Sequence, residues 1–383
     1  MVADRFPGIG RANNVSRIRS RGRDGGRTSV SNASSRPVVF FQTKPSQVDV
    51  PIFEYLAAIG VDLRVIFRRL DQPRDPELLV SPNFGALTVG YSWSVRSARV
   101  PAGAHVVVEG WSRWWAWRVI AATKLTPGRS LGVRFDTIAL GTTGRVTRRL
   151  ARTRARLALF LADAWHPVGD QSHTFAQSEC WWSRPTVVIP YAVKERLFDR
   201  DSSSELCSLH DKNLTALVVS KLSPREAVAD VIRAMEGLDN WSLTVVGDGP
   251  DRRNLERLAI SLDVRASFVG YVAYEELPVY YRRADLFIHP ARVEPWGVSV
   301  QEAMLSGLAV LASDRVGSAA ELLPKPAAEW CFTAGDSMEL ASLIIKMSEP
   351  ELRKVHGREN WAAARKRCSR VAAEGIASFL SLA

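Results

Sequence analysis

The sequence predicts an α/β protein built from two doubly wound, Rossmann-like domains that face each other across a cleft. Three observations lead to this prediction. The chain has 383 residues, enough for two domains that each bury a core. Short apolar segments alternate with helical patterns in both halves, which is typical of parallel sheets covered by helices. A polar segment with Asp201-Ser-Ser-Ser-Glu205 at its centre separates the two halves.

Changes in composition divide the chain into five segments. Residues 1–36 have few apolar side chains to bury, so we expect a disordered, Arg-rich tail there. We place the first Rossmann-like domain at 37–192, a linker at 193–213 and the second Rossmann-like domain at 214–358. The pattern of Trp361, Val371, Ile376 and Phe379 predicts a C-terminal helix over 359–383.

Individual elements follow from the same patterns. In the first half, 51–60 reads as a helix and buried runs predict strands at 37–42, 62–67, 104–109, 130–135, 159–163 and 186–189. In the second half, the predicted strands are 214–222, 242–246, 266–269, 285–290, 309–313 and 330–333, each followed by a helical pattern. Ligands in such sheets bind at the carboxyl ends of the strands, so we expect the functional residues there.

The net charge of +11 is concentrated in the tail and in residues 145–156, and the remaining chain is nearly neutral. A neutral body argues against a nucleic-acid groove. Residues from 145 onward form a helical pattern whose apolar side chains, Val146, Leu150 and Leu157, should dock on a core. An Arg face would then point outward, either as a surface for anionic lipid or as a solvated helix face. The residues of this face are Arg145, Arg148, Arg149, Arg152 and Arg156.

Other features exclude several classes of protein. No apolar run approaches the ~18 residues that a membrane-spanning helix needs, and the first residues lack a secretory hydrophobic region. The four cysteines are widely separated, without a histidine at ligand spacing. We therefore expect neither a disulfide scaffold nor a structural zinc site, and we expect a cytoplasmic location.

The segment Glu294-Pro-Trp-Gly-Val-Ser-Val-Gln-Glu302 carries the clearest chemical signal. A loop carboxylate precedes Gly297, and the helix that follows begins at Val298 and Ser299. Free N–H groups and the helix dipole make such a start suited to phosphate. Glu302, one turn into the helix, is placed to accept from a ribose, although two solvated acids on a capped helix would give the same pattern.

This segment and its surroundings resemble the retaining glycosyltransferase family 4, the glycosyl transferases group 1, which has the GT-B fold. The Glu294–Glu302 spacing, Ser306-Gly-Leu-Ala-Val310, Val246-Gly-Asp-Gly-Pro250 and Phe268-Val-Gly-Tyr271 all match motifs of that family in the right order. The match is strong over 214–325 and weak over 37–200. The resemblance implies a GT-B protein whose C-terminal helix crosses back to the first domain.

The resemblance also implies roles for residues of the second domain. Glu302 would hold the ribose of a nucleotide-sugar and Glu294 would contact its sugar. The diphosphate would meet the backbone at the start of the helix, and two glycines would let the preceding loop line the cleft. These backbone positions are Gly297, Val298, Ser299, Gly247 and Gly249.

One departure from the family concerns the cations that face the diphosphate. The family has Gly-Arg-Leu and then Lys-Gly after the first strand of this domain, whereas this chain has Ser220-Lys-Leu-Ser-Pro-Arg-Glu-Ala227. Lys221 takes the place of the Arg and Glu226 that of the Lys. Either Arg225 substitutes for the missing cation, or the domain is a catalytically weakened, sugar-nucleotide-binding or scaffold protein.

The first domain would bind the acceptor. Its candidates follow predicted strands: Lys44 and Gln47 after the first, Trp111 after the third, and Arg134 and Asp136 at the end of the fourth. Trp111 either stacks on a sugar ring or packs in the core. Asp136 and Arg134 either orient the acceptor hydroxyl or lie in a surface turn.

Together these observations predict transfer of a hexose, with retention, from a UDP- or GDP-linked sugar to a saccharide or lipid-linked acceptor. The setting would be polysaccharide, glycolipid or cell-envelope synthesis, with the protein peripheral at the inner membrane face. We expect no bound cofactor and no metal, because positive side chains and a helix N-terminus replace the metal in this fold. The catalytic candidates are Glu294, Lys221, Arg225 and Asp136.

Overall fold

The structure is a computed structural model that describes residues 36–43, 48–67, 88–91, 100–138, 144–199, 213–367 and 369–382. Residues 1–35 of the predicted tail, Lys44, Gln47 and most of the predicted linker lie outside these residues. Two six-stranded sheets form the described part of the chain, and every strand pair in both sheets is parallel. Two Rossmann-like domains are therefore present, as the sequence predicts.

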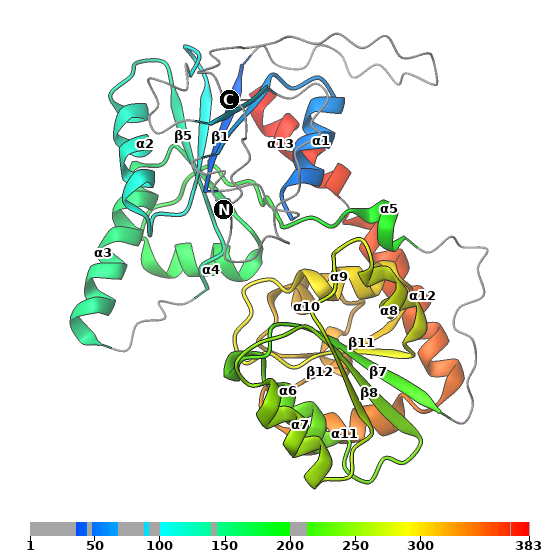
Figure 1. Ribbon diagram of the computed structural model, residues 1–383. Coiled ribbons are helices and arrows are strands. Elements are labelled where there is room, and N and C mark those ends of the chain that lie inside the picture. The colour runs from blue at the N-terminus through cyan, green and yellow to red at the C-terminus, as the bar shows by residue number, and fades with distance from the viewer. Residues whose placement is uncertain are drawn as a thin grey trace, which may run out of the picture.

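The first sheet has the order β3-β2-β1-β4-β5-β6, with the chain order reversing between β1 and β4. Its strands are β1 (Val38–Gln42), β2 (Leu63–Phe67), β3 (Thr88–Tyr91), β4 (His105–Glu109), β5 (Ser130–Phe135) and β6 (Ala164–Pro167). One face packs on α2 (Trp114–Lys124), α3 (Arg145–Leu161) and α4 (Asp170–Glu179), and the other on α1 (Val50–Ala58). Figure 1 shows this layering in the blue to green part of the chain.

The second sheet repeats the arrangement, with the order β12-β11-β10-β7-β8-β9 and the reversal between β10 and β7. Its strands are β7 (Leu214–Val219), β8 (Trp241–Val246), β9 (Ala266–Gly270), β10 (Leu286–His289), β11 (Ala309–Ser313) and β12 (Cys331–Phe332). Its helices are α6 (Val228–Ala234), α7 (Arg252–Ser261), α8 (Leu277–Arg283), α9 (Val298–Leu305), α10 (Gly317–Leu322) and α11 (Ser337–Lys346). Short helical turns lie at α5 (Glu195–Phe198), η2 (Pro224–Glu226) and η3 (Ala327–Trp330).

The chain ends by returning to the first domain. Helix α12 (Pro350–Lys366) packs on α9 and β11 of the second domain, and α13 (Ser369–Leu382) packs on α1 of the first. Figure 1 shows α13, in red, beside the blue α1. Ala373 and Ile376 are buried in the same cluster as Phe40 and Phe53. The crossing is as predicted, but two helices make it where the sequence predicts one.

Two predicted strands of the first half are wrong. Residues 159–163 do not form a strand, because α3 continues to Leu161 and β6 starts only at Ala164. Residues 186–189 also lack a strand: one isolated bridge joins Thr186 to Trp165. The apolar run at 159–163 is the buried end of an amphipathic helix, and a run this short does not distinguish the two structures.

Candidate functional site

The carboxyl edge of the second sheet is shaped by close backbone contacts between the loops after β7 and β8, next to its switch point. A Cβ atom at Gly247 would overlap the carbonyl oxygen of Ser220, and one at Gly249 would overlap that of Leu222. Gly247 also has a φ of 130°, which side chains rarely adopt. Both glycines are therefore required for the loops after β7 and β8 to lie against each other along the crevice.

The loop that carries Glu294 is fixed by α10. The N–H of Gly317 donates to the carbonyl of Glu294, at 3.0 Å, and the Ser318 hydroxyl donates to that of Gly297, at 2.9 Å. Gly297 has a φ of 88° and begins α9. The N–H groups of Val298 and Ser299 are in the first turn of α9, where the helix itself offers no acceptor. The predicted helix start is present, and its contact with a phosphate stays a prediction.

Glu294 lies near charged groups from two other segments of the chain. Its carboxylate is 3.7 Å from the guanidinium of Arg225 and accepts the N–H of Trp296 at 3.2 Å. Burial raises the pKa of Glu294, and the nearby charges of Glu226 and Asp136 raise it further. Asp136 belongs to the first domain and is near enough for its charge to affect Glu294, so three of the four predicted catalytic residues, Glu294, Arg225 and Asp136, lie near one another.

The arrangement of Arg225, Glu226 and Lys221 bears on the departure from the family. Arg225 and Glu226 lie in η2, and the Arg225 guanidinium donates to the buried Glu226 carboxylate at 3.1 Å. The same guanidinium, although 55% exposed, lies 3.7 Å from the Glu294 carboxylate, whereas the ion pairs that the structure describes include none of Lys221. The fold therefore positions Arg225 beside Glu294, and Glu226 is its ion-pair partner.

Glu302 lies in the second turn of α9 and is buried, with 3% exposure. Its carboxylate accepts the hydroxyl of Tyr281 at 2.8 Å, and burial raises its pKa to about 7. The hydrogen bonds that the structure describes for this carboxylate stay inside the domain. Its contact with a ribose stays a prediction.

His289 ends β10 at the same switch point and faces the backbone of Gly297. Burial, with the charge of Arg225, lowers the pKa of His289 to about 4. Its imidazole is therefore neutral at pH 7 and adds no charge to the crevice.

The candidates of the first domain lie at the carboxyl edge of the first sheet. Arg134 is buried, and its guanidinium donates to Asp49 and to the carbonyls of Ile189 and Pro190. It also stacks over the ring of Tyr191, whose hydroxyl donates to Asp136 at 3.0 Å. The alternative that Arg134 lies in a surface turn is wrong, because this residue is buried in β5. The side chain positions Tyr191 and, through it, Asp136.

A cavity of about 380 Å³ opens at this edge. Trp111 borders it and packs on Phe135 with ring centroids 5.3 Å apart, so this residue packs in the core, and its stacking on a sugar ring stays a prediction. Glu109 and Tyr191 border it too, although the sequence analysis did not select them. The one feature of the sequence that could have indicated Glu109 as a candidate is its position as a charged residue at the end of an apolar strand.

The two domains meet beside the Glu294 loop. The Glu321 carboxylate of α10 accepts the N–H of Asp170, the first residue of α4, at 2.6 Å. A Cβ atom at Gly169 would overlap that carboxylate and lie 2.7 Å from the Trp296 ring. Burial and the charge of Asp170 raise the pKa of Glu321 to about 7. This contact fixes α4 of the first domain against the loop of the second, and no local pattern points to partners 151 residues apart.

Helix α3 forms as predicted but docks through other residues. Val146, Leu150 and Leu157 are exposed, so their expected docking on the core is wrong. The helix packs through Ala155, Ala158 and Leu159 instead, because small side chains allow the close approach. Arg152 and Arg156 form ion pairs with Glu179 of α4, at 2.9 and 3.2 Å.

Among the residues that the structure describes, no group of three histidine, cysteine or carboxylate side chains has the arrangement of a metal site. None of the helices in the same ranges combines the length and the apolar character needed to cross a bilayer.

Comparison with known proteins supports the resemblance of the second domain to the glycosyl transferases group 1. Residues 201–367 match the family model of the glycosyl transferases group 1. The chain is 32% identical over 126 residues to the alpha-monoglucosyldiacylglycerol synthase of Streptococcus pneumoniae, covering 31% of this chain and 26% of the relative. It is 29% identical over 184 residues to the GDP-mannose-dependent alpha-(1-6)-phosphatidylinositol monomannoside mannosyltransferase of Mycobacterium tuberculosis, covering 43% and 47%. The chain thus spans about a quarter to a half of the length of these relatives.

Solved structures extend the similarity over both domains. The crystal structure of Anabaena Alr3699/HepE in complex with UDP superposes with a TM-score of 0.72 and 20% identity, covering 91% of this chain and all of that one. Sucrose-phosphate synthase from Thermosynechococcus elongatus gives a TM-score of 0.70 at 18% identity, with 90% and 98% covered. These similarities confirm the predicted GT-B fold.

Proposed function

Because residues 201–367 form a glycosyl transferases group 1 domain in a GT-B fold, we propose that this protein transfers a hexose from a nucleotide-sugar to an acceptor, with retention. The observation that carries the proposal is that Glu294, just before the start of α9, lies 3.7 Å from the Arg225 guanidinium and near enough to Asp136 of the first domain to be affected by its charge. The donor is UDP- or GDP-linked, and the acceptor is a saccharide or a lipid-linked sugar.

In this proposal the diphosphate lies against the first turn of α9 and the guanidinium of Arg225. Both oppose the negative charge that grows on the leaving phosphate, so both stabilise the transition state more than the ground state. These groups do the work of a metal ion, and the reaction needs no bound cofactor. Glu294 accepts from hydroxyls of the donor sugar and holds it toward the first domain.

The contact of Glu321 with α4 keeps the two domains together around this crevice. A closed crevice excludes water, which limits hydrolysis of the donor. Glu302 supports α9 from inside through Tyr281 and is placed to meet the ribose when the nucleotide binds.

The experiment that tests the proposal incubates the purified chain with UDP-glucose or GDP-mannose and a panel of octyl glycosides. Release of UDP or GDP measures turnover, and nuclear magnetic resonance of the product identifies the anomer. We expect an α-glycoside from the α-linked donor and its loss in Glu294→Gln, with Glu236→Gln, an exposed site, as the matched control. A β-product would contradict retention. Equal turnover in the two variants would contradict a role for Glu294 in the reaction.

A weakened transferase is the second candidate, because the buried Glu226 holds Arg225 through an ion pair. It would bind the nucleotide without turnover. Glu226→Gln distinguishes the two candidates: in a weakened enzyme, freeing the guanidinium raises turnover, whereas in a competent enzyme the change loosens Arg225 and lowers it.

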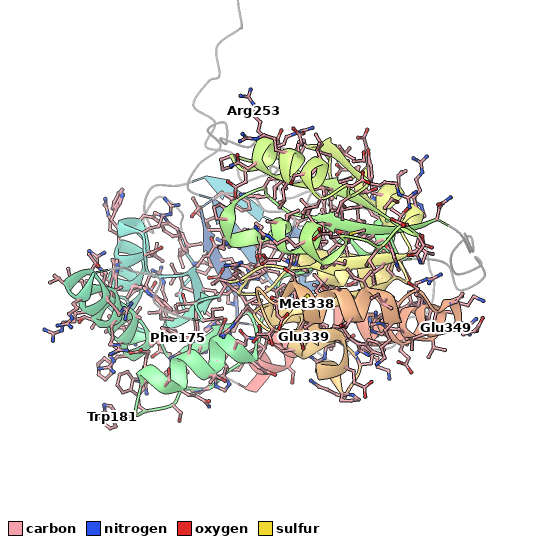
Figure 2. The ribbon with its side chains drawn as sticks, turned by 90° about the horizontal axis from the view of Figure 1, so that it is seen from below. Phe175, Trp181, Arg253, Met338, Glu339 and Glu349 are labelled. Carbon is pink, nitrogen blue, oxygen red and sulfur yellow. The ribbon has the colours of Figure 1, made fainter. Side chains whose placement is uncertain are left out.

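We also propose that the protein works at the inner face of a membrane, in glycolipid, polysaccharide or cell-envelope synthesis. The arginine face of α3 accompanies exposed apolar side chains, of which Val146 is 71% and Leu150 58% exposed. Trp181, after α4, is 92% exposed and points away from the body of the molecule in Figure 2. Cationic and apolar side chains on one surface favour the headgroup region of an anionic bilayer.

Vesicle flotation tests this second proposal. The chain should float with phosphatidylglycerol vesicles at low salt and stay in solution with phosphatidylcholine vesicles. Arg149→Ser and Leu150→Ser should each weaken flotation, and Arg253→Ser, on the second domain, should not (Figure 2). Equal flotation with both lipids, or with all variants, would contradict it.

A further inference from the structure

Arg292 lies at the switch point of the second sheet. It comes three residues after β10, in the loop that leads to Glu294, whereas η2 and α6 follow β7. Strands β7 and β10 are neighbours, and the chain order of the sheet reverses between them. In a doubly wound sheet the connections from two such strands run to opposite faces, so their loops separate at this point.

Arg292 joins the separated loops through both its backbone and its side chain. Its N–H donates to the carbonyl of Arg225 in η2 at 2.9 Å. Its guanidinium donates to both carboxylate oxygens of Asp230, in the first turn of α6, at 2.9 and 3.2 Å. Asp230 is buried, and a buried carboxylate needs such a partner.

The loop that carries Arg292 is also anchored on its other side. The hydroxyl of the buried Ser313, at the end of β11, donates to the carbonyl of Ala291. The N–H of Glu294 donates to the carbonyl of Arg315 at 3.1 Å. The loop is therefore fixed to β11 and to the segment before α10, and Arg292 extends this frame to η2.

The segment that Arg292 holds contains a strained joint. Ala227, between η2 and α6, has a φ of 54° and a ψ of 32°, a left-handed conformation that is unfavourable for a residue with a Cβ atom. Such a conformation persists only where the surrounding contacts fix it. Arg292 holds Arg225 on one side of this joint and Asp230 on the other, so a single residue fixes both ends.

A second arginine pairs with Asp230 without joining the two loops. The guanidinium of Arg233, one turn further along α6, donates to the same carboxylate at 3.2 Å. Both side chains are about half exposed, Arg233 51% and Arg292 55%, so their charges are similarly solvated. Arg233 thus matches Arg292 in partner and exposure, and it differs in the element from which it comes.

We propose that Arg292 is a positioning residue, which holds the guanidinium of Arg225 beside Glu294 through Asp230 and the backbone of η2. The inference rests on the proposed function for its consequence. The cation that meets the diphosphate is fixed before the donor binds, so the reaction spends no free energy on ordering it. Arg292 itself faces Asp230 and needs no contact with the substrate.

The test uses the full chain and measures nucleotide release from UDP-glucose and GDP-mannose. The variants are Arg292→Gln and Arg292→Lys, with Arg233→Gln as the matched control, and Arg292→Gln is also made in an Arg225→Ala chain. Hydrogen exchange is followed at the N–H of Arg292 and at that of Glu226, which donates to the Ser223 carbonyl at 3.0 Å. This second measurement needs no substrate, and denaturant unfolding verifies that each variant folds.

We expect Arg292→Gln to lower kcat by about tenfold and to change the KM for the donor much less, because Arg225 acts mainly in the transition state. Arg292→Lys keeps the charge but not the paired donors, and it should recover part of the loss. Arg233→Gln should keep the kcat of the wild type within about twofold. In the Arg225→Ala chain, Arg292→Gln should lower kcat no further, since residues that act through one another are not additive.

The two amides should exchange about tenfold faster in Arg292→Gln and at the wild-type rate in Arg233→Gln. Equal kcat in these two variants would overturn the inference. A further loss of kcat in the Arg225→Ala chain would also overturn it, because Arg292 would then act without Arg225. Unchanged exchange in Arg292→Gln would overturn it without reference to the reaction. If the wild type consumes neither donor, the proposed function fails, whereas faster exchange in Arg292→Gln alone would still show that Arg292 holds η2.

Discussion

The carboxyl edges of the two sheets differ in what they are made of. At the edge of the second sheet the shape comes from backbone: Gly247 and Gly249 against neighbouring carbonyls, and the first turn of α9. At the edge of the first sheet it comes from side chains, among them Glu109, Arg134 and Tyr191 around a cavity. A backbone site suits a part of the substrate that never varies, such as a diphosphate. A side-chain site can be changed one residue at a time without loss of the fold.

The largest effect is expected at Arg225. If it faces the diphosphate, Arg225→Ala should lower turnover by ~10²–10³, as loss of one transition-state donor does. Lys221→Ala should change turnover by less than about tenfold, because the ion pairs that the structure describes hold Arg225 beside Glu294 and include none of Lys221, whose solvated charge contributes little. Steady-state assays of nucleotide release compare the two. The reverse order would show that Lys221, the residue at the family's Arg position, is the working cation.

Alanine substitution of one glycine at each sheet edge compares how tightly the backbone is packed there. Gly247→Ala should destabilise the protein by about 3 kcal/mol, because the new Cβ overlaps the Ser220 carbonyl and the backbone must move. Gly110→Ala, at the first edge, should cost about 1 kcal/mol, since Gly110 has a φ of 65° but open space around it. Denaturant unfolding of both variants measures the difference. Equal losses would mean that the second edge is not held by backbone contacts.

Glu302 gives an effect that depends on pH. Its pKa is near 7 in the folded chain, above the ordinary value of 4.5, so the folded state holds the proton more tightly. The contribution of this raised pKa to the free energy of unfolding is then fully present below about pH 4.5 and is lost as the pH rises through 7. Glu302→Gln removes the ionisation. Its free energy of unfolding, relative to that of the wild type, should therefore increase between pH 5 and 8 by on the order of 2–3 kcal/mol. A constant difference across this range in denaturant unfolding would contradict the burial of an ionisable group.

The smallest effect is expected where the two edges meet. Glu321→Ala removes the acceptor of the Asp170 N–H, so protection of that amide from hydrogen exchange should fall by about tenfold. Glu321→Gln keeps an acceptor and should retain most of the protection. Unchanged exchange in the alanine variant would show that this contact does not hold the domains together.

The same contrast explains what the sequence could predict. The second domain was predicted nearly element by element, since each strand and helix has its own pattern and the Glu294–Glu302 segment is contiguous. The first edge is assembled from Glu109, Arg134 and Tyr191, which are far apart in the chain and meet only when the sheet has formed. The docking face of α3 was missed for a related reason, because Ala155 and Ala158 are small and carry little hydrophobic signal.

The most direct test of the central claim, that the second edge binds a nucleotide-sugar, is thermal shift of the wild type and Glu302→Ala with UDP, GDP, UDP-glucose and GDP-mannose. A ligand at 100 times its Kd stabilises a protein by about 2.7 kcal/mol, which is readily measured. We predict stabilisation by the UDP or the GDP pair and its loss in Glu302→Ala. No stabilisation of the wild type by any of the four would contradict the account.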